Sequence, residues 1–124
     1  MRVRACHMSV SVAALAGMLG CSDAIGPICT DEARPGILVT VRDSVTRAPV
    51  SGARVVARMG TTIDTSSGLP DGTYPLAYEK PGTYEVTVDQ TGYRLWTSGN
   101  VPVTRDECHV QTVSLTALIQ PSGT

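Results

Sequence analysis

The chain has 124 residues, 42% of them hydrophobic, with ten basic and eleven acidic side chains and a formal net charge of −1. This length fits one domain with a modest core. The charges are nearly balanced and form no basic run, which argues against a nucleic-acid-binding protein, because such proteins present a basic face.

The first twenty residues have the pattern of a secretory signal peptide. Arg2 and Arg4 give a positive start, and residues 9–20 form a short, largely apolar run that ends in glycine. A charged flank, an apolar run and a small final residue are typical of an exported chain. The run is too short to span a bilayer, which takes about 20 apolar residues. We expect residues 1–20 to be removed on export.

Residues 18–21 (Met-Leu-Gly-Cys) resemble the lipobox of bacterial lipoproteins, whose cysteine is lipidated and becomes the new N-terminus. Gly20 and Cys21 match that motif, whereas Met18 stands where leucine is usual. The resemblance implies that Cys21 carries a lipid anchor and begins a short tether over residues 21–35. It also implies a membrane-anchored protein of the bacterial cell envelope that faces the periplasm, with the outer membrane favoured over the inner one.

The remaining cysteines form a single pair. Cys6 belongs to the signal peptide and Cys21 is assigned to the lipid, which leaves Cys29 and Cys108. Disulfides persist in oxidising compartments, and a bridge across a loop of about 80 residues stabilises by roughly 4–5 kcal/mol in the chain-entropy model. We therefore predict a disulfide here. The alternative is a metal site with His109, which is disfavoured because neighbours on a strand point to opposite faces.

Alternating apolar and polar residues predict β-strands along most of the remaining sequence. Turn residues separate these segments at intervals of about 8–12 residues, which is typical of an all-β sandwich. The longest polar loop is expected at residues 60–72. In chain order, the predicted strands are residues 36–42, 53–59, 74–78, 83–90, 93–97, 101–103 and 108–118. The predicted core is built from Ile37, Val39, Val41, Val55, Tyr84, Val86 and Val88.

The last predicted strand changes phase along its length. Cys108 and Val110 lie in one register, and Val113 and Leu115 lie in the other. A β-bulge near residues 110–112 would reconcile the two registers. The alternative is a strand that is buried on both faces.

Several segments together resemble the carboxypeptidase regulatory-like domains. The matching segments are Val39-x-Val41-x-Asp43, residues 46–55 (TRAPVSGARV), residues 72–76 (GTYPL) and residues 81–88 (PGTYEVTV) followed by Gly92-Tyr93. Arg47 stands where that family commonly has glycine. The resemblance covers residues 36–117. It implies a seven-stranded, antiparallel sandwich of the Ig-like or transthyretin-like type, related to collagen-adhesin B-like repeats, over residues 36–118 and followed by a tail at 119–124.

The inventory of side chains argues against an enzyme. After removal of the signal peptide the chain has one histidine, His109, which we expect to lie exposed on a strand. Nucleophilic catalysis needs an oriented base beside its nucleophile, and no such pair is evident. The zinc ligands of the catalytic carboxypeptidase domain are absent, so the resemblance carries no peptidase activity. We predict no catalytic residue, no metal and no cofactor.

Two loop regions are candidates for contact with a ligand or partner. Tyr93 and Trp96 lie near one end of the sandwich, where they either cap the core or present aromatic surface. Asp64 and Asp71 flank the predicted polar loop and either contribute to a weak calcium site or are simply solvated. We predict a non-enzymatic, lipid-anchored structural or protein-interaction module with an envelope protein as its partner. The alternative is a carbohydrate- or peptide-binding module that uses Tyr93 and Trp96.

Overall fold

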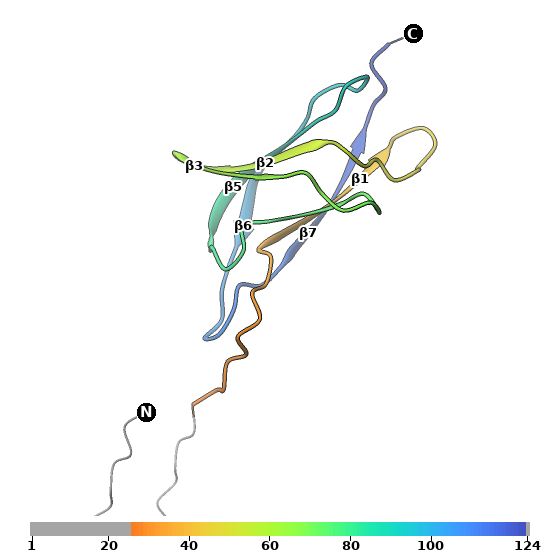
Figure 1. Cartoon of the computed structure of the whole chain (residues 1–124). Coiled ribbons are helices and arrows are strands. Elements are labelled where there is room, and N and C mark those ends of the chain that lie inside the picture. The colour runs from red at the N-terminus through yellow and green to blue at the C-terminus, as the bar shows by residue number, and fades with distance from the viewer. Residues whose placement is uncertain (1–25, 124) are drawn as a thin grey trace, which may run out of the picture.

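The computed structural model describes residues 26–123, so the predicted signal peptide and Cys21 lie outside the described residues. Seven strands form two facing sheets (Figure 1). They are β1 (Ile37–Asp43), β2 (Arg54–Met59), β3 (Thr62–Ser66), β4 (Thr73–Leu76), β5 (Gly82–Asp89), β6 (Trp96–Val103) and β7 (Val113–Ile119). None of the described residues belongs to a helix that could cross a membrane.

The predicted all-β sandwich is confirmed. One sheet has the strand order β4-β1-β7 and the other has the order β3-β2-β5-β6. One pair departs from the antiparallel pattern, since β1 and β7 run parallel from Ile37 beside Val113 to Asp43 beside Ile119. The reason is that β6 ends beside the start of β1, and a short loop at residues 104–112 returns the chain so that β7 starts at the same end.

Seven strands were predicted and seven occur, but the structure differs from the prediction in three places, the last of which is the start of the final strand. The expected polar loop at residues 60–72 contains β3, which pairs with β2. The two strands expected at residues 93–97 and 101–103 are one continuous strand, β6. Its pairing with β5 shifts by one residue at Gly99 and Asn100, where Asn100 has a φ of 56°. This bulge interrupts the alternation of the sequence.

The phase change near the C-terminus has a different cause from either predicted one. The last strand begins at Val113, and residues 104–111 form a loop closed by the N–H of Gln111, which donates to the carbonyl of Thr104 at 2.7 Å. Val110 is buried from within this loop. Neither a bulge nor a doubly buried strand is needed, because the two registers belong to different elements.

The core between the sheets contains every residue that the alternation predicted, together with Tyr74, which is fully buried. The hydroxyl of Tyr74 accepts a hydrogen bond from the N–H of Ala53 at 3.0 Å and donates to the carbonyl of Val50 at 2.8 Å. Its ring packs so closely on Gly68 that a Cβ there would overlap it. Tyr74 therefore links the β1–β2 connection to the interior.

Replacing Tyr74 with phenylalanine is expected to lower the free energy of unfolding by about 1–3 kcal/mol, because the buried N–H of Ala53 and the partly buried carbonyl of Val50 lose their partner. Urea unfolding followed by circular dichroism measures the change. The matched control is Tyr78→Phe, at a ring that is 45% exposed beyond the end of β4, which should change stability by less than about 0.5 kcal/mol. Equal stability of the two variants would contradict the role given to Tyr74.

Candidate functional site

The segment that precedes β1 is fastened to the loop that precedes β7. Cys29 and Cys108 are joined by a disulfide, with their Cα atoms 5.1 Å apart across 79 residues of sequence. The predicted pairing is therefore confirmed. The parallel arrangement of β1 and β7 explains it, because both strands start at the same end of the sheet and the residues before them meet (Figure 1).

Beside the disulfide lies His109, which is only 8% exposed. The expectation that it would be exposed on a strand is wrong, because residues 104–111 form a loop that turns the ring toward the N-terminal segment. The Oδ1 of Asp106 shapes this loop by accepting from the N–H groups of Cys108 at 2.8 Å and His109 at 2.9 Å. These two hydrogen bonds are the main causes that lower the pKa of Asp106.

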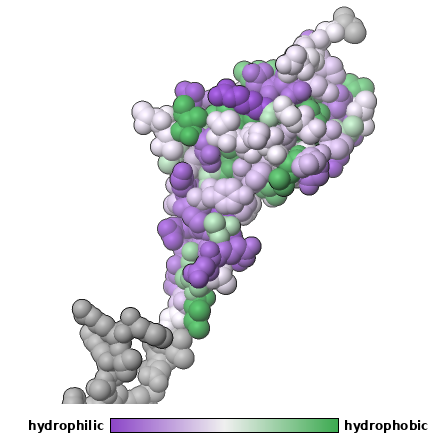
Figure 2. Space-filling model, in the orientation of Figure 1, coloured by the Kyte–Doolittle hydropathy of each residue, from purple (hydrophilic) through white to green (hydrophobic). Residues whose placement is uncertain are grey.

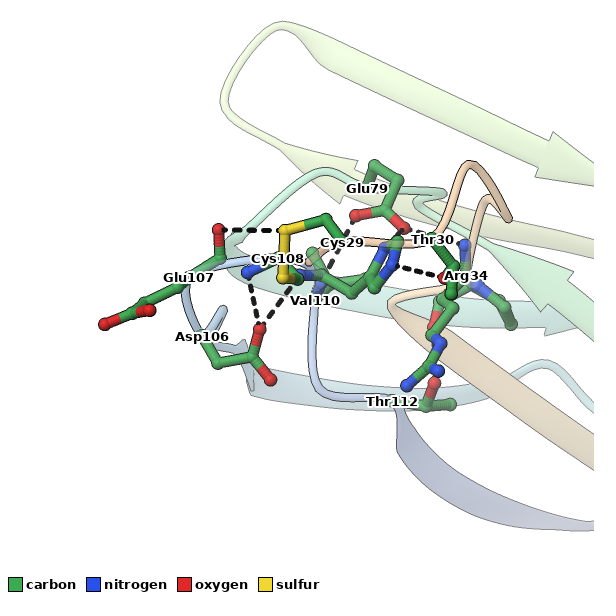
Figure 3. A network of polar contacts seen from close by, with 11 residues as sticks. Cys29, Thr30, Arg34, Glu79, Asp106, Glu107, Cys108, Val110 and Thr112 are labelled. Atoms are coloured by element: carbon green, nitrogen blue, oxygen red, sulfur yellow. Dashed lines mark hydrogen bonds and ion pairs between the residues drawn. A yellow bond between two sulfur atoms is a disulfide. The ribbon is translucent and has the colours of Figure 1, made fainter. Parts of the chain in front are cut away.

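The imidazole of His109 joins two distant segments. Figure 3 shows that their residues Thr30 and Glu79 lie close to each other beside the disulfide. Its Nδ1 lies 2.7 Å from Oε1 of Glu79, and its Nε2 lies 3.0 Å from Oγ1 of Thr30. Because the ionised carboxylate of Glu79 can only accept, Nδ1 donates to it, and Nε2 shares a hydrogen bond with the hydroxyl of Thr30. The imidazole thus bridges the N-terminal segment to the turn that follows β4.

Glu79 is the centre of this network. Its carboxylate also accepts from the N–H of Arg34 at 2.8 Å and from the N–H of Val110 at 3.3 Å. The N–H of Glu79 donates in return to the carbonyl of Arg34 at 3.0 Å. The hydrogen bond from Arg34, followed by the one with His109, lowers the pKa of Glu79. We call this group the N-terminal clasp; it comprises Cys29, Thr30, Arg34, Glu79, Asp106, Cys108, His109 and Val110.

At the opposite end of the sandwich, the hydroxyl of Tyr93 forms a hydrogen bond within the domain. Its hydroxyl donates to Oδ2 of Asp43 at 2.9 Å, and its ring packs against the core. The other oxygen of Asp43 accepts from the N–H groups of Val45 and Thr46 at 2.7 and 3.0 Å. These hydrogen bonds, with that of Thr46 the largest, lower the pKa of Asp43. Tyr93 therefore holds the turn after β1, and its contact with a partner stays a prediction.

Trp96 lies nearby, partly buried against the core, and lines a groove of about 420 Å³ between the start of β6 and the end of β7. The groove contains Leu95, which is 65% exposed, and Leu118, which is 37% exposed. A smaller hollow of about 370 Å³ adjoins it at Val45. Sequence reasoning found Trp96 but missed its neighbours. The signal was present, because two adjacent apolar residues at 95 and 96 break the alternation of a half-buried strand.

Comparison with known proteins now settles the family. Residues 36–116 match the model of the carboxypeptidase regulatory-like domain, which is more than half of the chain. The chain belongs to the carboxypeptidase regulatory-like domain family. The matched span includes the groove residues Trp96 and Leu95 but begins after the disulfide-linked part of the N-terminal segment.

The solved structures similar to this carboxypeptidase regulatory-like domain include a chain in the crystal structure of a type II Cohesin-X-Dockerin complex, a C-terminal interface mutant from Acetivibrio cellulolyticus. The identity is 21% and the TM-score is 0.48, and the match covers 67% of this chain and 55% of that one. This chain therefore matches only about half the length of that structure. The comparison with curated proteins gives no match.

In the clasp of this carboxypeptidase regulatory-like domain, a hydroxyl (Thr30), an imidazole (His109) and a carboxylate (Glu79) follow one another. The same order of groups activates the nucleophile in many hydrolases. Catalysis also needs hydrogen-bond donors for a developing oxyanion and a hollow where substrate can reach the hydroxyl. Neither Thr30 nor His109 lines the groove beside Trp96 or the hollow at Val45. Both oxygens of Glu79 accept main-chain N–H groups, from Arg34 and from Val110, so this carboxylate ties the N-terminal segment and the loop before β7 to the turn after β4.

The two aspartates considered for calcium are engaged with the main chain. Asp64 accepts from the N–H of Ala77 at 2.6 Å, and Asp71 accepts from both the N–H and the hydroxyl of Thr73. The hydroxyl and N–H of Thr73 lower the pKa of Asp71. Among residues 26–123, no group of three or more histidine, cysteine, aspartate or glutamate side chains is placed to hold a metal ion.

Acidification is expected to loosen the N-terminal clasp. The pKa of Glu79 is lowered in the folded chain, so the stability it contributes is present above its usual carboxyl pKa and is lost as the pH falls through the lowered value. The thermal midpoint of Glu79→Gln should lie below that of the wild type at pH 7 and fall less steeply between pH 5 and pH 3. Thermal unfolding at several pH values measures both slopes.

Glu85→Gln on β5 is the matched control, since Glu85 is exposed on the surface of the sheet. Its pH dependence should follow that of the wild type. If Glu79→Gln also follows the wild type, Glu79 does not stabilise the clasp in its ionised form.

Proposed function

We propose that this domain is a non-enzymatic interaction module that a lipid on Cys21 holds at a bacterial cell envelope, facing the periplasm. The observation that carries the proposal is the Cys29–Cys108 disulfide, which fastens the chain to the sandwich soon after the predicted lipidation site. A structural disulfide fits export to an oxidising compartment. The residues left as a tether are 22–28, which reach at most about 25 Å. The sandwich would then stay close to the membrane, and we favour the outer membrane.

The placement of the clasp and the groove supports a role in presenting a binding surface. Figure 1 shows the N-terminal segment leaving one end of the sandwich and the C-terminal residues leaving the other. The groove beside Trp96 lies at the end where the chain terminates, since Gln120 contributes to its wall. An anchor on Cys21 would therefore turn the groove away from the membrane and toward envelope proteins.

The chemistry of the groove favours a protein partner over a sugar. Its most exposed apolar side chain is the aliphatic Leu95. Stacking on a sugar needs an open aromatic face, whereas Trp96 is partly buried and the hydroxyl of Tyr93 is used by Asp43. On the face seen in Figure 2, hydrophilic and intermediate residues predominate and hydrophobic ones are scattered. Of the two ligands considered in the alternative, a carbohydrate or a peptide, the apolar groove favours a peptide.

The anchor is tested by replacing the predicted lipidation site. Cys21→Ser should move the protein from the membrane fraction to the soluble fraction, because the lipid supplies the membrane affinity. Fractionation of cells followed by immunoblotting measures the distribution. Cys6→Ser, in the predicted signal peptide, is the control and should leave the protein at the membrane. A full-length Cys21→Ser protein that remains with the membrane would show that the lipobox prediction is wrong.

A further inference from the structure

One edge of β7 has no strand paired with it in the described part of the chain. The other edge pairs with β1. The N–H of Val113 donates to the carbonyl of Gly36 at 2.9 Å, on the β1 side. Because main-chain groups alternate along a strand, those of Ser114, Thr116 and Leu118 point away from β1. All three of these residues are exposed.

The ends of this edge are closed by contacts with the neighbouring sheet. At one end the N–H of Arg94 donates to the carbonyl of Gln120 at 2.8 Å, and at the other the N–H of Gln111 donates to the carbonyl of Thr104. Residues 114–118 lie between these two contacts. This stretch has the length of a common short strand.

The other three edges carry features that discourage strand pairing. β4 contains Pro75, and β6 contains Pro102 and the bulge at Gly99 and Asn100. β3 contains Asp64, a charged residue whose carboxylate accepts from the N–H of Ala77. Prolines, bulges and charges are the means by which natural sheets protect their edges. β7, with the sequence Val-Ser-Leu-Thr-Ala-Leu-Ile, contains no proline and no charged residue.

The groove adds side-chain recognition at the end of this edge. Leu95, Trp96 and Leu118 form an apolar surface, and Arg94 lies in the same wall. Within residues 26–123 Arg94 has no ion-pair partner. A guanidinium beside an apolar groove complements an apolar side chain that is followed or preceded by a carboxylate.

We infer that the open edge of β7 binds an extended segment of a partner protein as an added strand. Main-chain groups of residues 114–118 pair with the segment, an apolar side chain of the segment enters the groove beside Trp96, and a carboxylate of the segment lies beside Arg94. Strand addition combines main-chain hydrogen bonds for affinity with side-chain pockets for specificity. The inference rests on the proposed function only in taking the partner to be a protein, and it does not depend on the lipid anchor.

Trp96 makes the test simple, because it is the single tryptophan of the chain. The probes are two synthetic peptides in which leucine and threonine alternate over seven residues, one with an aspartate before the first leucine and one with an aspartate after the last. The full chain is purified from whichever cell fraction holds it, and Trp96 emission is followed as peptide is added. We expect a saturable change in emission for at least one peptide.

Two changes in the peptide distinguish strand addition from non-specific hydrophobic binding. Replacing its aspartate with lysine should weaken binding by about two- to fivefold, as expected for one exposed ion pair. Methylating the alternate main-chain nitrogens that would face β7 should weaken binding by more than about tenfold, because several hydrogen bonds are lost together. Neither change alters the folded protein.

Variants of the chain complete the test. Arg94→Ala should abolish the preference for aspartate over lysine, whereas Arg105→Ala, at an exposed arginine beyond the other end of β6, should preserve it. Thr116→Pro removes an N–H from the open edge but none from the β1 side, and it should abolish binding with the circular dichroism spectrum unchanged. If this variant fails to fold, the methylated peptides still decide the question.

Three outcomes would overturn the inference. The first is that the methylated and unmethylated peptides bind alike, and the second is that no peptide changes Trp96 emission. The third is a concentration-dependent dimer in sedimentation that the peptides do not disrupt, which would assign the edge to a second copy of the chain. If the protein is found in the soluble fraction and still binds the peptides as described, the lipid anchor is contradicted and the strand-addition inference stands.

Discussion

The parallel pairing of β1 with β7 is the constraint on which the other features depend. It runs over seven residues of each strand, from Ile37 beside Val113 to Asp43 beside Ile119. Because both strands start at one end, the residues that precede them meet there, and this brings Cys29 to Cys108. The same pairing puts β7 at the edge of its sheet. The clasp at one end and the open strand edge along one side are therefore two consequences of one pairing.

Alternation in the sequence predicted the core well because buried strands leave a strong pattern. It failed where the pattern is weak. β3 has no fully buried residue, and its one large apolar side chain, Ile63, is 54% exposed, so the segment was predicted to be a loop. β6 contains a bulge at Gly99 and Asn100, and the interruption was interpreted as a break between two strands. Local periodicity reports burial, and only indirectly reports pairing.

The disulfide of the candidate site could be predicted from the number of cysteines in the sequence. Two cysteines remained after the signal peptide and the lipobox were assigned, so the disulfide followed from composition and compartment. The environment of His109 did not follow. Its two partners, Thr30 and Glu79, lie 79 and 30 residues away in sequence, and the turn that presents Glu79 has a φ of 51° at that residue. No local pattern in the sequence indicates such a meeting.

The central claim is that the disulfide and the hydrogen bonds around Glu79 hold the N-terminal segment to the sandwich. Hydrogen exchange followed by mass spectrometry, on the wild type and on a Cys29→Ala/Cys108→Ala variant, tests this claim most directly. The account predicts faster exchange in the variant at the N–H groups of Arg34, Glu79 and Val110, which bond within the clasp, with the N–H groups of β5 protected as before. Unchanged exchange at those three positions would contradict it.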